Sequence, residues 1–171
     1  MDGGPFLTLP LVYTQHPETG KGNLGMYRNQ IYDDRTAGMH FQIHRGIGFH
    51  YFEAEKLEKP LPALIFLGGP PALIMAAVAP MPENVPELML ASLLAGRRLE
   101  RCPGPGAHPL VSSAEIALVG HVAPNERRPE GPFGDHYGYY SLRHDYPVFR
   151  VDWLCRRREA IYPATVVGKP R

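Results

Sequence analysis

Residues 63–78 read ALIFLGGPPALIMAAV and form the most apolar stretch of the chain. Glycines and prolines at positions 68–71 interrupt it, so neither half is long enough to span a bilayer. The first half, Ala63–Leu67, is a short all-apolar run that predicts a buried strand. The second half opens with prolines, which the first turn of a helix tolerates, and predicts a strongly apolar helix. We therefore expect a buried strand followed directly by a helix.

Strands predominate on both sides of this stretch. Alternating or β-branched patterns predict further strands at Phe6–Thr14, Leu24–Tyr32, Ala37–Ile43, Arg98–Cys102, Ala114–Val122, Val148–Arg156 and Ala160–Val167. Two more helices are expected, at Ile47–Glu58 and at about 85–95. For the second of these, Asn84 is the predicted N-cap, Pro86 and Glu87 suit the first turn, and Gly96 suits the carboxyl end.

The turn-forming residues limit the fold class. The 18 glycines and 19 prolines are about 22% of the 171 residues, which excludes a helical bundle but stays below the roughly 25–30% typical of disorder. Helices are inserted between strands and do not alternate with them one for one, which argues against a doubly wound parallel sheet. The sequence, without repeats or linkers, predicts a single α+β domain, mainly β, with an antiparallel barrel or sandwich and helices packed at its side.

Charge and cysteine content narrow the possible partners and location. The formal net charge of +1 gives no field that would attract nucleic acid or an anionic membrane nonspecifically. The two cysteines, Cys102 and Cys155, have no metal or redox spacing, which fits the reducing cytosol. The opening MDGGPFLTLPL has neither the basic region nor the apolar run of a signal peptide. These features predict a cytoplasmic protein with no transmembrane segment.

One loop carries two acids that could do chemistry. Glu130 and Asp135 are separated by two glycines and a proline, and a bent loop could direct both carboxylates into one pocket. Two carboxylates held together cannot both ionise easily, so one would acquire a raised pKa and could deliver a proton near neutrality. The alternative is a surface turn with solvated acids.

An arginine and a group of histidines are also candidates. Arg28 lies in an otherwise apolar strand and needs an acidic partner, for which Glu130 or Asp135 is suitable; an ordinary structural ion pair is the alternative. His40, His44 and His50 lie near Glu53 and Glu55, but the H-x3-H spacing of His40 and His44 indicates zinc only on a helix, which this segment does not resemble.

Several stretches together resemble the UbiD family of prenylated-FMN-dependent decarboxylases. They are GNLGMYRNQIYDD (22–34), GMHFQIHRG (38–46), LGGPPALIMAA (67–77), PMPENVPELMLASLLAG (80–96) and RPEGPFGDHYGYYS (128–141), and they occur in that family's order. The resemblance implies a split β-barrel of the flavin-reductase-like type, with residues 1–171 forming one prenylated-FMN-binding domain of a longer decarboxylase. It also implies Mn²⁺ and a monovalent cation, K⁺ or Na⁺, as further cofactors.

The resemblance assigns roles to individual residues by motif. The implied catalytic residues are Arg28, Glu130 as its partner, and Asp135 as the proton donor. The implied metal ligands are Asn23, His44 and Glu87, of which the asparagine and the glutamate offer hard oxygen atoms that suit Mn²⁺. The implied contacts to the prenylated flavin are made by Met26, Tyr27, Arg28, His40, Phe41, Gln42, Arg45 and Gly46.

The implied activity is a non-oxidative, reversible decarboxylation of an aromatic or α,β-unsaturated carboxylic acid, of the kind found in quinone biosynthesis. A polyprenyl-hydroxybenzoate or a naphthoate is a substrate of this type, and a lipophilic substrate would place a cytoplasmic enzyme at the membrane periphery. The implied partners are a flavin prenyltransferase that supplies the cofactor and further copies of the chain in a homo-oligomer. Two alternatives stay open: a flavin- or metal-binding module that needs other domains or a partner chain, and a flavin-reductase-like oxidoreductase.

Overall fold

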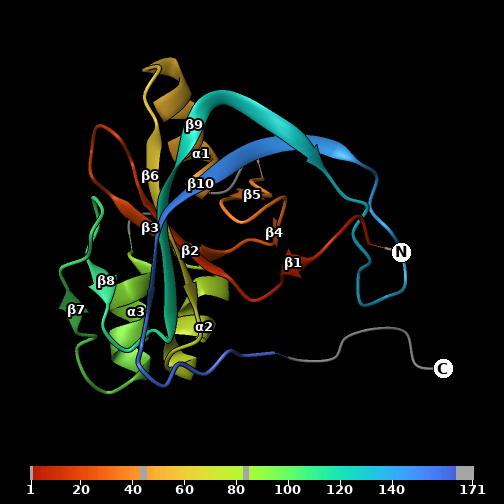
Figure 1. The fold of residues 1–171 in the computed structure, drawn as a ribbon. Coiled ribbons are helices and arrows are strands. Elements are labelled where there is room, and N and C mark those ends of the chain that lie inside the picture. The colour runs from red at the N-terminus through yellow and green to blue at the C-terminus, as the bar shows by residue number, and fades with distance from the viewer. Residues whose placement is uncertain (1, 43–45, 83–84, 165–171) are drawn as a thin grey trace.

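The centre of the molecule is a six-stranded antiparallel sheet. The computed structural model describes residues 2–42, 46–82 and 85–164. The strand order of the sheet is β3-β2-β6-β9-β10-β5. Its members are β2 (Leu11–Gln15), β3 (Gly22–Met26), β5 (Thr36–Gly38), β6 (Leu61–Leu67), β9 (Ile116–Glu130) and β10 (His144–Arg156). Strands β9 and β10 form a long curved hairpin that extends well beyond the other strands (Figure 1).

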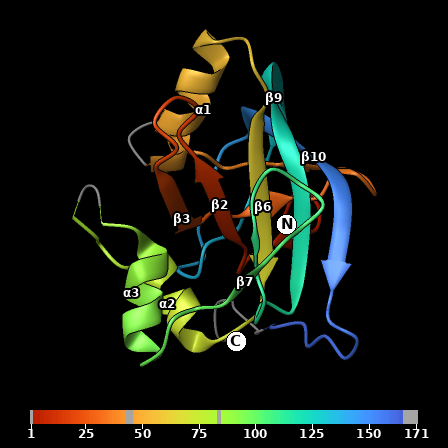
Figure 2. The same ribbon diagram turned by 90° about the vertical axis from the view of Figure 1, so that its left-hand side faces the viewer.

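The remaining elements lie around this sheet. Two short pairs accompany it: β1 (Phe6–Leu7) with β4 (Asn29–Gln30), and β7 (Arg101–Cys102) with β8 (Leu110–Val111). The helices are α1 (Gly46–Lys56), α2 (Pro71–Val78) and α3 (Glu87–Leu94). Helix α1 lies at one end of the molecule, whereas α2 and α3 lie together at the other (Figures 1 and 2). This arrangement agrees with the predicted α+β class, in which helices pack beside a mainly antiparallel sheet.

Strand β6 explains why residues 63–67 are apolar throughout. Ala63 and Ile65 pack in the core beneath α1, together with Ile47 and Tyr51 of that helix. Successive side chains of a strand point to opposite faces, so Leu64 and Phe66 enter a second core against α2 and α3. A central strand that is buried on both faces has no position for a solvated side chain. The predicted buried strand and the helix after it are confirmed.

The helix predictions are largely confirmed. Helix α1 matches the expected helix at Ile47–Glu58, and α3 falls within 85–95. Gly96 ends α3 in the left-handed region at φ 64°, as its predicted place at the carboxyl end requires. The amino end differs, because Pro86 occupies the N-cap position without a side-chain hydrogen bond and the helix begins at Glu87. Asn84, the predicted N-cap, lies outside the described residues.

Several strand boundaries were predicted wrongly. Phe6–Thr14 divides at Pro10, which cannot donate a ladder hydrogen bond, into β1 and β2 of different sheets. Leu24–Tyr32 divides into β3 and β4, because the chain leaves the main sheet at Tyr27. The structure contains only the short strands β5 and β7 where strands were expected at Ala37–Ile43 and Arg98–Cys102. Residues 160–164 of the expected strand at Ala160–Val167 form no strand, and the rest lies outside the described residues.

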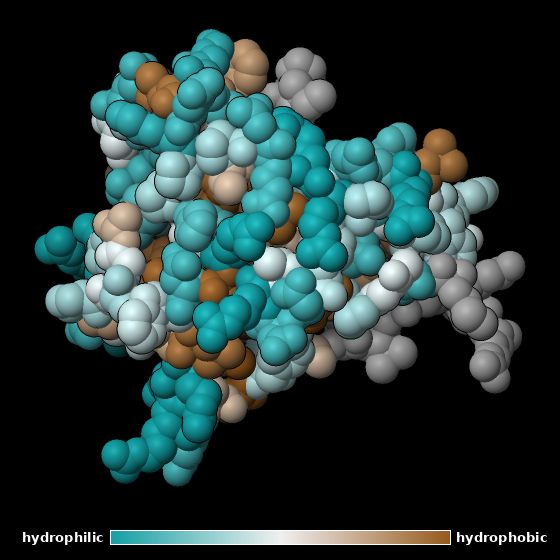
Figure 3. Space-filling model, turned by 45° about the horizontal axis from the view of Figure 1, so that its top comes forward, coloured by the Kyte–Doolittle hydropathy of each residue, from teal (hydrophilic) through white to brown (hydrophobic). Residues whose placement is uncertain are grey.

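The surface over the top of the molecule is mainly hydrophilic (Figure 3). An ion pair between Arg127 and Glu55 joins the β9–β10 hairpin to α1, and one between Arg150 and Glu126 joins the two strands of the hairpin, each at 2.8 Å or less. No helix in the described part of the chain combines the length and apolar character needed to cross a bilayer.

We predict that Gly120→Ala destabilises the fold by about 3 kcal/mol, because extra volume in a packed interior costs this much. A Cβ at Gly120 would lie 1.9 Å from the carbonyl oxygen of Arg150, a backbone atom that cannot move without disturbing the β9–β10 ladder. Gly104→Ala is the matched control, because its Cβ would meet only the movable side chain of Leu110. Chemical unfolding of both variants measures the difference. Equal losses would contradict the steric argument.

Candidate functional site

The buried carboxylate of Glu130 is the centre of the site. Glu130 ends β9 with only 1% of its side chain exposed. Its Oε1 accepts hydrogen bonds from Arg28 Nε at 3.0 Å and from Nη2 at 2.8 Å, and His40 Nδ1 lies 2.6 Å from Oε2. Arg28 follows β3 and His40 follows β5, so three separate segments meet at this one side chain. The predicted pairing of Arg28 with Glu130 is confirmed.

These contacts determine the ionisation of Glu130. Burial alone would raise the pKa of its carboxyl group, but the hydrogen bonds from His40 and Arg28 outweigh burial and hold the pKa below its usual range. Burial also raises the pKa of the neighbouring Tyr146 hydroxyl, and the negative charge of Glu130 adds to the effect. The site therefore holds a carboxylate anion paired with a cation that is 21% exposed.

Two aromatic residues complete the walls of this site. The guanidinium carbon of Arg28 lies 4.4 Å from the ring centre of Phe133, and the His40 ring lies 4.4 Å from the Tyr146 ring. Phe133 belongs to the loop that the sequence singled out. Tyr146 carries no motif, and only the pairing of β9 with β10 brings it opposite Arg128, near Glu130.

Asp135, the second predicted acid, has contacts only within its own loop in the described part of the chain. Its Oδ1 accepts hydrogen bonds from the amides of Tyr137 at 2.9 Å and Tyr139 at 3.1 Å, and its side chain is exposed. Asp135 therefore shapes the turn, and no described hydrogen bond or ion pair joins it to Glu130 or Arg28. Its role as proton donor stays a prediction.

The chain between the two acids is fixed from outside the loop. Gln30 Oε1 accepts a hydrogen bond from the amide of Gly131 at 2.7 Å, and Gln30 Nε2 donates to the carbonyl of Gly3. Asp2 Oδ1 accepts from the amide of Gly134 at 2.7 Å. Arg28 and Gln30 thus bond to the consecutive residues Glu130 and Gly131, which orients the loop toward β4 and the amino-terminal segment.

Two of the predicted metal ligands, Asn23 and Glu87, lie at the edge strand β3 of the sheet. Glu87, in the first turn of α3, accepts a hydrogen bond through Oε2 from the amide of Leu24 at 3.0 Å. Leu24 follows Asn23, whose side chain lies against Gly46 at the start of α1. A Cβ at Gly46 would approach Asn23 Oδ1 to 2.0 Å, so any larger residue there would displace the Asn23 amide.

This donor set fits a hard divalent cation, because an amide oxygen and a carboxylate are oxygen ligands of the kind that Mn²⁺ prefers. His44, the third predicted ligand, lies outside the described residues. Within those residues, no cluster of three histidine, cysteine, aspartate or glutamate side chains could hold a metal ion. The metal assignment therefore depends on Asn23 and Glu87.

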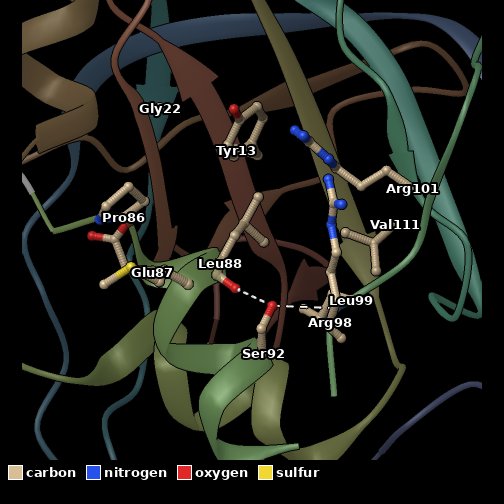
Figure 4. Close-up of a pocket in the computed structure, with 11 residues that line it drawn as sticks. Tyr13, Gly22, Pro86, Glu87, Leu88, Ser92, Arg98, Leu99, Arg101 and Val111 are labelled. Atoms are coloured by element: carbon tan, nitrogen blue, oxygen red, sulfur yellow. Dashed lines mark hydrogen bonds between the residues drawn. The ribbon is translucent and has the colours of Figure 1, made fainter.

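A cavity of about 300 Å³ adjoins Glu87 and is also lined by Gly22, the first residue of β3 (Figure 4). Tyr13, Leu88, Leu99 and Val111 line its apolar part. Arg98 and Arg101 also line the cavity (Figure 4). Ser92 stabilises the wall by donating to the carbonyl of Leu88 and accepting from the amide of Leu99. The cavity thus adjoins one of the predicted metal ligands, Glu87, from the α3 side.

The other predicted flavin contacts lie around the end of β3. Met26 ends this strand and packs toward the α2–α3 core, while Tyr27 packs edge-on against Phe41 at 6.0 Å on the opposite side. Gln42 is exposed, and Gly46 is exposed at the amino end of α1. Arg45 lies outside the described residues. The flavin roles of all these residues stay predictions.

The histidines and acids near residue 50 do not form one cluster. His40 bonds to Glu130, whereas His50 bonds to the buried hydroxyl of Thr14. Glu53 pairs with Lys56, and Glu55 pairs with Arg127. Each of these four described side chains therefore has its own partner. The structure also reveals the Thr14–His50 bond, which the sequence did not predict.

Comparison with known proteins identifies a family. The UbiD domain, described as the 3-octaprenyl-4-hydroxybenzoate carboxy-lyase Rift-related domain, matches residues 1–170. A curated relative from Chlamydia pneumoniae, named as one of the subunits of a 4-hydroxybenzoate decarboxylase, is 54% identical over 170 residues. That alignment covers 99% of this chain and 29% of the relative. The chain thus spans about 30% of the length of the curated relatives that it matches first.

Solved structures agree with this result. The UbiD-class enzyme HmfF from Pelotomaculum thermopropionicum, in complex with prFMN, is 29% identical, with a TM-score of 0.89 over 94% of this chain and 38% of that chain. The closed form of vanillic acid decarboxylase from Sedimentibacter hydroxybenzoicus is 29% identical, with a TM-score of 0.92 over 99% of this chain and 37% of that chain.

A more distant structure bears on the fold alone. Component B of the nitrilotriacetate monooxygenase from Bacillus cereus is 16% identical, with a TM-score of 0.56 over 91% of this chain and 73% of that chain. The predicted split barrel of the flavin-reductase-like type is thereby confirmed.

We predict that Glu130→Gln lowers the free energy of unfolding at pH 7 by about 3 kcal/mol, because it removes the anion from a buried charge pair. Folding lowers the pKa of Glu130, so the ionised side chain makes its full contribution to the free energy of unfolding above the ordinary pKa of 4.5. This contribution is lost as the pH falls through the lower pKa of the folded state. In Glu130→Gln, we expect this part of the pH dependence of the free energy of unfolding to be absent. Urea unfolding between pH 3 and pH 7 measures both effects.

Glu126→Gln is the matched control, because it breaks the exposed pair with Arg150. Exposed pairs contribute about 1 kcal/mol or less. A loss at Glu126 as large as that at Glu130 would contradict the special contribution of the buried pair.

Proposed function

Because the chain belongs to the UbiD family of carboxy-lyases, we propose that it is the cofactor-binding domain of a non-oxidative, reversible decarboxylase. The proposed substrates are aromatic or α,β-unsaturated carboxylic acids, including acids of the kind used in quinone biosynthesis. The observation that carries the proposal is the buried Glu130 carboxylate between Arg28 and His40.

Arg28 is the proposed binding group for the substrate carboxylate. Its Nε and Nη2 are held by Glu130, while Nη1 has no partner among the described residues and the side chain is 21% exposed. Phe133 covers the guanidinium group and lowers its hydration. A planar guanidinium that is fixed along one edge can present its remaining donors to a carboxylate with little loss of side-chain entropy.

Glu130 and Asp135 divide the remaining tasks in this proposal. Glu130 stays ionised and keeps Arg28 and His40 in place. Asp135 holds the proton that replaces the carboxyl group on the product. The loop hydrogen bonds of Gln30 and Asp2 set the distance between the two acids, since they fix the backbone from Gly131 to Gly134.

The proposed cofactors are prenylated FMN, Mn²⁺ and a monovalent cation. When bound, prenylated FMN supplies the electron sink for loss of CO₂. Asn23 and Glu87 would hold the divalent cation together with His44. The amino end of α1 at Gly46 adjoins Asn23, and a helix amino terminus attracts phosphate, which favours binding of the flavin phosphate at this point. Tyr27, Phe41 and His40 offer flat side chains for the ring system.

The proposal extends to the protein's surroundings. A cytoplasmic location, a flavin prenyltransferase as the supplier of the cofactor and a homo-oligomeric assembly are proposed from the family. The HmfF structure is of an evolved dimeric form, and the chlamydial relative is named as a subunit of a decarboxylase, which supports an assembly of several chains.

We predict that the chain, reconstituted anaerobically with prenylated FMN and Mn²⁺, releases CO₂ from a panel of aromatic and unsaturated acids that includes 4-hydroxybenzoate. CO₂ release is followed by gas chromatography and flavin binding by absorbance. Flavin binding without turnover would instead support a binding module that needs other domains. Oxidation of NAD(P)H would support a flavin-reductase-like enzyme.

Asp135→Asn is predicted to abolish turnover and leave flavin binding intact. The asparagine keeps an oxygen acceptor for the amides of Tyr137 and Tyr139, so the turn is preserved, but it cannot transfer a proton. Asp145→Asn is the control, because Asp145 is an exposed acid on β10. Full activity of Asp135→Asn would remove Asp135 from the reaction.

A further inference from the structure

A buried polar pair joins α1 to the central sheet and has no part in the site described above. Thr14 Oγ1 and His50 Nδ1 lie 2.8 Å apart, with exposed fractions of 0% and 6%. Val12, two residues before Thr14 on β2, and Ile47 of α1 belong to the apolar core beneath this helix. Apolar residues of similar volume would fill this space without the cost of burying polar groups. The hydrogen bond therefore constrains the orientation of α1 relative to β2, which apolar packing alone would not do.

The register of β2 and β3 links this pair to the proposed metal site. Thr14 and Asn23 are directly opposite each other in the ladder, so their side chains share one face of the sheet. Gly46 precedes His50 by four residues, so both lie on one face of α1. Consecutive turns of α1 thus rest on opposed residues of the sheet, His50 on Thr14 and Gly46 on Asn23.

We propose that the Thr14–His50 hydrogen bond is a positioning contact that fixes α1 on β2 and thereby orients the Asn23 side chain for metal binding. The inference rests on the proposed role of Asn23 as a metal ligand. Because Gly46 lies so close to Asn23 Oδ1, a small rotation or shift of α1 changes the room available to the Asn23 amide. The hydrogen bond prevents that movement.

The ionisation of His50 is consistent with this role. Burial first, and the nearby His16 second, lower the pKa of His50 to about 4, so the imidazole is neutral at neutral pH. The His16 ring lies 5.6 Å from the His50 ring and also faces Phe49. A neutral ring offers one donor and one acceptor, and either suits the Thr14 hydroxyl. The Thr14–His50 hydrogen bond is therefore unaffected by ionisation of His50 at the near-neutral pH at which an enzyme of this kind would operate.

The test compares three variants of the chain by the dissociation constant for Mn²⁺, measured by electron paramagnetic resonance of the free ion. Thr14→Val removes the hydroxyl at nearly constant volume and is expected to weaken Mn²⁺ binding by about 10-fold, as the loss of a group that orients a metal ligand typically does. Thr14→Ser keeps the hydroxyl and should bind within about 2-fold of the unsubstituted chain.

Tyr51→Phe is the matched control. It removes another hydroxyl bond from the same helix, to the carbonyl of Ala123 at 3.1 Å on β9, which carries none of the proposed metal ligands. A lower unfolding temperature with unchanged Mn²⁺ affinity is expected. Normal affinity in Thr14→Val would overturn the inference, and so would equal weakening in Tyr51→Phe.

A second measurement separates this inference from the proposed function. The side-chain amide signal of Asn23 is recorded by nuclear magnetic resonance without metal, and Thr14→Val is expected to shift it more than Tyr51→Phe does. If the unsubstituted chain binds no Mn²⁺, the metal role of Asn23 fails, and the amide signal alone decides the positioning role. An unmoved Asn23 signal in Thr14→Val would overturn that role.

Discussion

The burial of one carboxylate, Glu130, constrains the rest of the structure. A buried anion must be paired and hydrogen-bonded, because leaving it uncompensated costs several kcal/mol. Arg28 and His40 supply this compensation from segments that follow β3 and β5, the two edge strands of the sheet. The long β9–β10 hairpin brings Glu130 to them. The ends of the sheet are therefore joined through a polar contact and not through a backbone ladder.

The sequence predicted the elements that depend on local chemistry. Apolar runs, prolines and glycines located β6, α1, α2 and α3, because composition within ten residues determines whether such elements form. Arg28 was recognised as needing an acid because an apolar strand cannot hold a free guanidinium. Recognition of the family, and not spacing, assigned Asn23 and Glu87 to a metal.

The remaining features depend on contacts between distant segments. The division of the expected strand at Leu24–Tyr32 follows from Arg28 and Gln30 reaching toward residues 130 and 131, about a hundred positions later. Tyr146 reaches His40 only because β9 and β10 pair in a particular register. The Thr14–His50 bond joins residues 36 positions apart, and no sequence pattern relates the two. No pattern within a short stretch of sequence predicts contacts between residues so far apart in the chain.

The hydrogen bond from the Leu24 amide to Glu87 has a further consequence. Strand β3 is an edge strand, and an edge with free amides is a template on which another chain can add a strand and begin to aggregate. The Glu87 carboxylate occupies one of these amides and places a negative charge at the open side of the strand. A residue proposed for metal binding thus also protects the newly folded domain from unwanted association before any metal arrives.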